Sequence, residues 1–67
     1  MKNTIRVERA IHELTQEQLA QKIKVSRQTI NAIEKGKYVP STVLALKLAK
    51  EFSKSVEEIF ELEEEDL

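Results

Sequence analysis

The amino-acid sequence predicts an all-α fold, a single domain built from five short helices. Length is the first observation, because 67 residues allow one domain and only a small core. The second is the spacing of apolar residues, which fits helices and shows no strong strand pattern. Glycine and proline provide the third, since each occurs once, at Gly36 and Pro40, and both mark the same turn.

Two helices are predicted in the first third of the chain. Asn3 or Thr4 caps the first helix, which runs to about Glu13. Its expected apolar contacts are Ile5, Ile11 and Leu14. Thr15 and the glutamine three residues later form a capping-box signature, in which each side chain bonds the backbone amide of the other residue. A second, short helix therefore covers about 16–23.

The third helix is predicted to begin after Ser26 and to cover 27–35. Ser26 supplies a side-chain oxygen that can accept a hydrogen bond from a free amide of the first turn. Ile30 and Ile33, three residues apart, give the helix an apolar edge. Gly36 ends it, since glycine suits the left-handed conformation found after many helices.

A fourth helix is predicted from Ser41 through Phe52. It is the most apolar segment of the chain, with Val43, Leu44, Leu46, Leu48 and Ala49. A fifth, short helix covers about 56–60. Together these helices form a domain over residues 1–62, and the acidic tail 63–67 is expected to be loose and solvated.

Charge is distributed unevenly along the chain, although the net charge is only −1. Residues 22–38 carry five basic side chains against one acidic side chain, whereas the last twelve residues carry seven acidic side chains and no basic one. The local field matters more than the total charge for binding a polyanion. We expect the basic middle to face phosphates and the acidic end to face away from them.

Several classes of function find no support in the composition. The chain has no cysteine and one histidine, so the sequence indicates neither a metal site nor a cofactor. No serine has a plausible base beside it in sequence, which argues against an enzyme. No apolar run approaches the roughly 20 residues that span a bilayer, and the polar first residues do not resemble a signal peptide. We expect a cytoplasmic protein without a small-molecule ligand.

The two helices over 16–23 and 27–35 are joined by a three-residue turn, the spacing of a helix-turn-helix. The second of them presents polar side chains outward: Arg27, Gln28, Thr29 and Asn31. Arginine can bond guanine in a bidentate manner, glutamine and asparagine can bond adenine, and the threonine methyl group can contact thymine. No acid occurs in the first turn, although the helix dipole favours one there. We interpret this surface as one that binds DNA.

The chain resembles the Xre family, the helix-turn-helix regulators of the Cro and phage-repressor type. The resemblance rests on the stretches Leu14–Ala20 and Val25–Tyr38, on Pro40-Ser41, and on Val56–Phe60. It covers roughly residues 3–60 and is greatest to small stand-alone bacterial and archaeal members. It implies a five-helix phage-repressor-like domain with the helix-turn-helix in the second and third helices.

The resemblance also implies roles for individual residues. The base-facing set would be Arg27, Gln28, Thr29 and Asn31, and phosphate contacts would come from Gln16, Lys35, Lys37 and Tyr38. Gln16 would also brace Gln28 from behind. Arg9 would form a structural ion pair with Glu34, which neutralises a carboxylate close to DNA.

Three positions depart from the family pattern. Lys24 and Glu13 stand where relatives often have glycine, and Glu8 stands where an apolar residue is frequent. A side chain at a positive φ costs on the order of 1 kcal/mol. Lys24 therefore either strains the turn or gains by placing a cation near phosphate, and we include it among the predicted phosphate contacts.

The predicted quaternary state follows from the small number of base pairs that one recognition helix can contact. One recognition helix covers few base pairs, so specificity normally comes from two half-sites about 34 Å apart. A homodimer would also cover Phe60 and Leu62. Small relatives pair through their C-terminal helices, and some add an antiparallel ribbon, which here would join Lys2-Asn3 to Glu61-Leu62.

The sequence thus predicts a homodimeric transcriptional regulator that binds a pseudo-palindromic operator in double-stranded DNA, as a repressor. The alternative is a protein-interaction module, such as the antitoxin of a toxin–antitoxin pair. Only the short acidic tail would then be available to wrap a partner.

Overall fold

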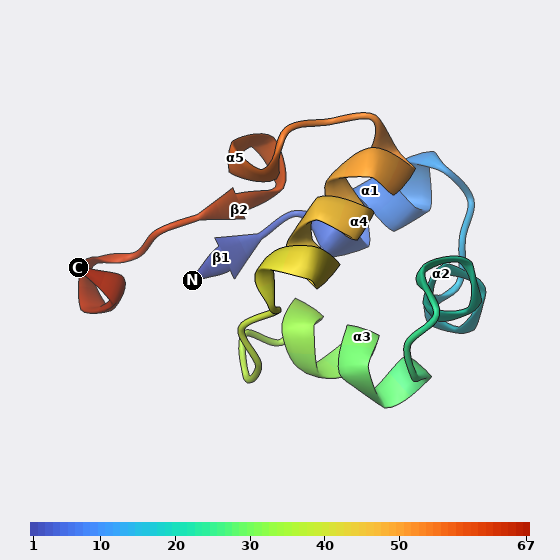
Figure 1. The fold of residues 1–67 in the computed structure, drawn as a ribbon, viewed down its shortest axis with the longest axis horizontal. Coiled ribbons are helices and arrows are strands. Elements are labelled where there is room, and N and C mark those ends of the chain that lie inside the picture. The colour runs from blue at the N-terminus through green and yellow to red at the C-terminus, as the bar shows by residue number, and fades with distance from the viewer.

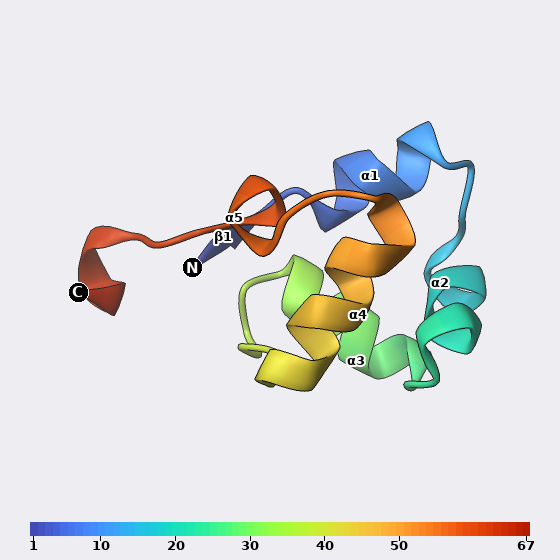
Figure 2. The same ribbon diagram turned by 45° about the horizontal axis from the view of Figure 1, so that its top comes forward.

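The computed structural model describes all 67 residues and contains the five expected helices (Figure 1). In chain order the elements are β1 (Lys2–Asn3), α1 (Ile5–Ile11), α2 (Gln16–Ile23), α3 (Arg27–Glu34), α4 (Thr42–Phe52), α5 (Val56–Ile59), β2 (Phe60–Glu61) and the 3₁₀ turn η1 (Glu64–Asp66). In Figure 1 helix α4 crosses the middle of the molecule, with α3 below it and α2 at the right, while α1 lies behind α4 there and above it in Figure 2.

The core is formed by residues from all five helices and from β2. Its buried apolar members are Ile5, Leu19, Ala20, Ile23, Ile30, Ile33, Leu44, Leu48, Ala49, Phe52, Ile59 and Phe60. The predictions for Ile5, Ile30 and Ile33 are confirmed. The prediction for Ile11 is wrong, because its side chain is 64% exposed.

The buried face of α1 passes through a charged residue and misses Ile11. Glu8 lies three residues after Ile5 on this face and is 3% exposed. Its Oε2 accepts a hydrogen bond from Lys54 Nζ at 2.6 Å, while its Oε1 has no partner. The hydrogen bond to Glu8 raises the pKa of Lys54. An ion pair therefore occupies a position on the buried face of α1.

Side chains with a hydroxyl group cap the N-termini of four of the five helices, and the caps predicted at Thr15 and Ser26 are among them. Thr15, Ser26, Ser41 and Ser55 each accept a hydrogen bond from the amide three residues later, at 3.0, 3.1, 3.2 and 3.2 Å. Helix α1 differs, because Thr4 makes no side-chain cap and Asn3 Oδ1 accepts from the amide of Ile5 at 3.2 Å instead. Local sequence signals set all of these starts.

Helices α1 to α4 share one kind of ending. Each is followed by a residue with positive φ: Glu13 (55°), Lys24 (62°), Gly36 (73°) and Ser53 (54°). The next amide then bonds the carbonyl five residues earlier, as in a Schellman motif. This ending explains why α1 stops at Ile11 and does not reach Glu13, and why α3 stops at Glu34, one residue earlier than predicted.

The predicted terminal ribbon is present within one chain. Strands β1 and β2 are antiparallel, with Lys2 opposite Glu61 and Asn3 opposite Phe60, one residue away from the predicted pairing. Phe60 adopts an extended backbone, so α5 ends at Ile59. The side chain of Phe60 is 8% exposed in the single chain, so the expectation that a dimer is needed to cover it is wrong.

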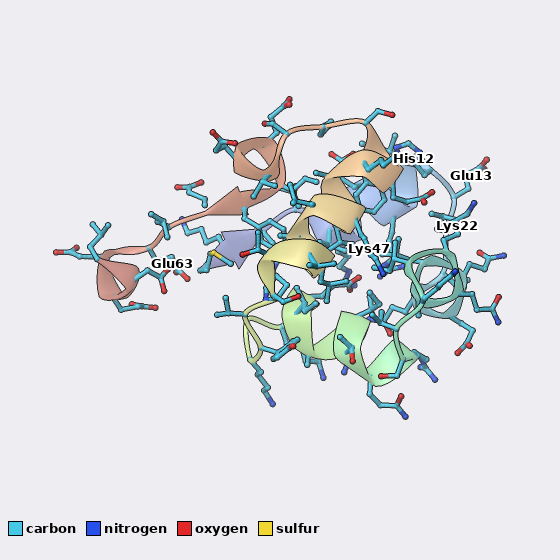
Figure 3. The ribbon with its side chains drawn as sticks, in the orientation of Figure 1. His12, Glu13, Lys22, Lys47 and Glu63 are labelled. Atoms are coloured by element: carbon cyan, nitrogen blue, oxygen red, sulfur yellow. The ribbon has the colours of Figure 1, made fainter.

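The C-terminal tail is solvated from residue 64 onward, as expected, but it also makes contacts with the N-terminus. The α-amino group of Met1 lies 2.8 Å from a carboxylate oxygen of Glu63 and 3.0 Å from one of Asp66, a contact that we call the terminal clasp. Hydrogen bonds to Glu63 and Asp66 raise the pKa of this amino group. Both chain ends consequently lie on one side of the molecule (Figure 1), and Glu63 is labelled in Figure 3.

Candidate nucleic-acid interface

Helices α2 and α3 form a rigid pair because they share one part of the core. Leu19, Ala20 and Ile23 of α2 and Ile30 and Ile33 of α3 are all buried. Val25, in the turn between the helices, is half-buried and packs against the same core, as expected of a residue that fixes their crossing. The geometry is that of the predicted helix-turn-helix.

The exposed side of α3 begins with two unengaged polar side chains. Arg27 and Gln28 are exposed and make no side-chain hydrogen bond or ion pair within the chain. Thr29 is half-buried, and its hydroxyl lies 2.9 Å from that of Ser26. Of the four predicted base-facing residues, Arg27 and Gln28 are therefore the two whose side chains are exposed and available to bind a ligand.

A polar network behind this surface joins α1, α2 and α3. Arg9 Nε donates to Glu34 Oε2 at 2.6 Å, and Arg9 Nη2 donates to Glu34 Oε1 at 3.1 Å. Arg9 Nη1 also donates to the carbonyl of Leu14 at 3.0 Å. The predicted ion pair is confirmed in bidentate geometry, and its hydrogen bonds raise the pKa of Arg9. The carboxylate at this surface is neutralised, and the first helix is fastened to the third.

Gln16, the first residue of α2, completes this network. Its Nε2 donates to Asn31 Oδ1 at 3.2 Å and to Glu34 Oε1 at 3.1 Å. The expectation that Gln16 braces Gln28 is wrong, because its amide bonds Asn31 and Glu34, which lie about one and two turns further along α3. Asn31 is thus half-buried and held by α2, whereas Gln28 projects freely.

Three adjoining hollows surround Gln16 and define the candidate interface. One is lined by Gln16, Arg27, Gln28 and Asn31, the second by Arg9, Thr15, Gln16, Glu17 and Arg27, and the third, of about 280 Å³, by Arg6, Arg9, Gln16, Asn31, Glu34 and Lys35. Arg6 is a cation that the sequence reasoning missed. Its position three residues before Arg9, on the same face of α1, is the signal that could have indicated it.

The turn after α3 adds further cations. Lys35, Lys37 and Tyr38 are exposed, and Gly36 between them adopts a φ of 73°. Asn3 Nδ2 donates to the carbonyl of Ile33 at 2.9 Å, so the N-terminal strand holds the end of α3 and this turn in place. Lys24 differs from the other predicted phosphate contacts, because it lies at the opposite end of α2 from Gln16 and lines a separate hollow.

None of the helices combines the length and the apolar character that crossing a bilayer requires.

Comparison with known proteins agrees with this geometry. The model of the helix-turn-helix family matches residues 5–59. An HTH-type transcriptional regulator of Methanocaldococcus jannaschii is 58% identical over 98% of this chain and 100% of its own length, and the HTH-type transcriptional regulator YgzD of Bacillus subtilis is 52% identical over the same shares. An HTH-type transcriptional regulator of Archaeoglobus fulgidus is 46% identical over 100% of this chain and 96% of its own. The chain belongs to the helix-turn-helix family of transcriptional regulators, in its Xre form.

Proposed function

We propose that the protein binds double-stranded DNA in a sequence-specific manner and regulates transcription, with α3 in the major groove. The observation that carries this proposal is the first turn of α3, where Arg27 and Gln28 project freely from a helix braced by the network of Arg9, Gln16 and Glu34. Base edges in the major groove are read by side chains of these types. The cations around them suit contacts to the sugar-phosphate backbone.

In the proposed mechanism, one set of residues contacts the bases and a second set contacts the phosphates. Arg27, Gln28, Thr29 and Asn31 face base edges, with Asn31 preorganised by Gln16. Lys35, Lys37 and Tyr38 contact phosphates on either side of the groove, and Arg6 extends this cationic border. Gln16 joins them by releasing one of its two Nε2 hydrogen bonds to α3. Side chains held by the fold before binding lose little entropy when DNA arrives.

We further propose a homodimer that represses transcription by occupying a pseudo-palindromic operator. Two copies of α3 about one helical turn of DNA apart would double the sequence that is read. The outer face of α4 offers a surface for the second copy. Val43 and Leu46 are three residues apart on α4, and Val39 lies in the turn before this helix; their exposed fractions are 64%, 57% and 64%. A repressor is expected to lower transcription from a promoter that overlaps its operator.

Selection of binding sites from random DNA tests the proposal, followed by affinity measurements on variants. Gln28→Ala should relax base preference at one position, a loss of about 1–3 kcal/mol in discrimination. Lys37→Ala should weaken binding to all sequences and reduce the salt slope by about 0.9. Gln21→Ala is the matched control, since Gln21 is exposed on α2 and lines none of the three hollows. If Gln28→Ala and Lys37→Ala both behave like Gln21→Ala, the assignment of α3 is wrong.

The proposed dimer face has its own test by sedimentation equilibrium. Leu46→Glu should shift the protein towards monomer, whereas Ile11→Glu places the same charge on an apolar residue of α1 that is 64% exposed and should leave the dimer intact. Dissociation by Ile11→Glu alone would move the interface to α1. Failure of selection to enrich any DNA sequence would favour the protein-interaction alternative.

A further inference from the structure

The open hollow between the end of α2 and the middle of α4 gathers four lysines. Its volume is about 460 Å³, and its lining residues are Lys22, Ile23, Lys24, Lys47, Lys50 and Glu51. Figure 3 labels Lys22, which comes from α2, and Lys47, which comes from α4. We call this hollow the lysine pocket. Four ammonium groups face one carboxylate there, so the lining carries a net charge of +3.

The lysine pocket is separate from the candidate nucleic-acid interface. It shares no residue with the three hollows around Gln16. Gln16 begins α2 and Ile23 ends it, so the two surfaces lie at opposite ends of an eight-residue helix, which is about 12 Å long at 1.5 Å per residue. The contacts proposed for α3 therefore leave the pocket unexplained.

Structural roles account for two of the four lysines. Lys47 Nζ donates to the carbonyl of Ile23 at 3.5 Å, which satisfies a free carbonyl at the end of α2. Lys22 Nζ lies 3.8 Å from a carboxylate oxygen of Glu51. Lys24 and Lys50 are exposed and have no hydrogen-bonded or ionic partner for their side chains in the chain. Their ammonium groups are therefore available to a ligand.

The backbone at Lys24 shapes the rim of the pocket. Lys24 has φ 62° and ψ 48°, a left-handed conformation that glycine adopts without steric cost. Glu13 and Ser53 adopt the same conformation at the ends of α1 and α4, so the pocket is distinguished by its charges and not by its backbone. Lysine at this position extends an ammonium group into the pocket, which a glycine cannot do.

We propose that the lysine pocket binds phosphate groups. Its single apolar residue, Ile23, is buried, so the head groups that a ligand meets in the pocket are charged. Several ammonium groups around an open hollow match a ligand with more than one phosphate oxygen, since lysine binds phosphate as a point charge through charge-assisted hydrogen bonds. The phosphates can belong to a DNA backbone beyond the reach of α3 or to a free polyphosphate anion, and the two sources are separated by experiment.

The first experiment uses tripolyphosphate and the full chain without DNA, followed by amide NMR shifts at low salt. We expect shifts concentrated at residues 22–25 and 47–51. Lys24→Gly and Lys50→Gln should each weaken binding about tenfold, the equivalent of one charge-assisted hydrogen bond. Lys24→Gly also relieves the positive φ, so a loss of binding there does not come from a damaged fold. Lys2→Gln is the matched control, because Lys2 is exposed in β1 and does not line the pocket.

The second experiment measures the affinity for DNA over a range of salt concentrations. If the pocket holds a backbone phosphate, Lys50→Gln reduces the slope of log K against log salt by about 0.9. If its ligand is a free polyphosphate, this slope is unchanged while binding of tripolyphosphate is lost. The proposal is overturned if Lys24→Gly and Lys50→Gln bind tripolyphosphate as Lys2→Gln does. That result leaves the effect of Gln28→Ala on base preference untouched, so the two proposals fail separately.

Discussion

Glu34 is a carboxylate close to the surface that we propose binds DNA. Its neighbours offset the cost of burying this negative charge. Its side chain is 7% exposed and receives three hydrogen bonds, two from Arg9 and one from Gln16. A buried carboxylate is tolerated when charged donors surround it, and it becomes costly when one of them is removed. This residue therefore couples the stability of the domain to the orientation of α3.

The substitution Arg9→Ala tests how much the Arg9–Glu34 ion pair contributes to stability. Arg9→Ala leaves Glu34 as a buried charge without its main partner, so we expect a loss of about 2–3 kcal/mol in the free energy of unfolding. Adding Glu34→Gln to this variant removes the unpaired charge and should recover part of the loss. Urea unfolding of both variants measures the difference. Equal stabilities would mean that the charge of Glu34 is not what makes the loss of Arg9 costly.

The Glu8–Lys54 pair allows a test by pH. Glu8 raises the pKa of Lys54 above its ordinary value of 10.5, so the stabilisation is complete below that pH and is lost as the pH rises through the raised pKa. Glu8→Leu fills the same place with an apolar side chain, and such replacements are often neutral or stabilising. We expect its Tm to match or exceed that of the parent chain at pH 7.

Thermal unfolding between about pH 9 and 11.5 gives the second half of this test. The Tm of the parent chain should fall more steeply than that of Glu8→Leu, because only the parent loses the ion pair. Parallel curves would contradict a stabilising role for the pair. Lys54→Met should lower the Tm at neutral pH, since it leaves a buried carboxylate without a partner.

At the scale of helices, the endings are more strained than the beginnings. Three of the four left-handed positions hold a side chain, at Glu13, Lys24 and Ser53, and only Gly36 is free of this penalty. Glu13→Gly and Ser53→Gly should each raise the free energy of unfolding by about 0.5–1 kcal/mol.

Gly36→Ala gives the opposite change at the same kind of position. It should lower the free energy of unfolding by about 1 kcal/mol, and lack of space is not the cause, because the nearest atom to an added Cβ, the carbonyl oxygen of Met1, lies 3.9 Å away. Chemical denaturation of Glu13→Gly, Ser53→Gly and Gly36→Ala measures whether the free energy of unfolding rises in the first two and falls in the third. Stabilisation by Gly36→Ala would show that the positive φ carries no penalty here.

The elements that local sequence specifies were predictable. The hydroxyls of Thr15 and Ser26 satisfy amides within their own first turn, so a cap can be recognised without knowledge of the fold. The exposure of Ile11 was not predictable, because the side of a short helix that becomes buried depends on where the neighbouring helices pack. In the same way, the partner of Gln16 depends on the crossing of α2 and α3, and the sequence does not specify the rotation of one helix against the other.

At the scale of the whole molecule, the terminal clasp should respond to pH at both ends of the range. The pKa of the Met1 amino group is raised above 8.0, so its contribution is complete below that pH and is lost as the pH rises through the higher value. The pKa of Asp66 is lowered below 3.8, mainly by a hydrogen bond from the amide of Glu63, so its contribution is complete above that pH and is lost on acidification.

We therefore expect η1 to be fully docked between about pH 4 and 8, and to detach only as the pH rises through the raised pKa of the Met1 amino group or falls through the lowered pKa of Asp66. Amide NMR shifts of Glu63 to Leu67 measure the docking. Acetylation of the N-terminus removes the positive charge and should release η1 at pH 7 while the helices remain folded. A tail whose shifts do not respond to acetylation would rule out the clasp as the cause of its docking.

Closure of the chain ends has a kinetic consequence. The ribbon and the clasp join residues from opposite ends of the chain, such as Lys2 with Glu61 and Met1 with Glu63, whereas the contact between α2 and α3 joins neighbours in sequence. Pairing distant residues requires the closure of a long loop, which is slower than forming local contacts. The helices should thus assemble first and the ends join last. Hydrogen exchange should report the reverse order, with the ends opening many times for each unfolding of the helical body.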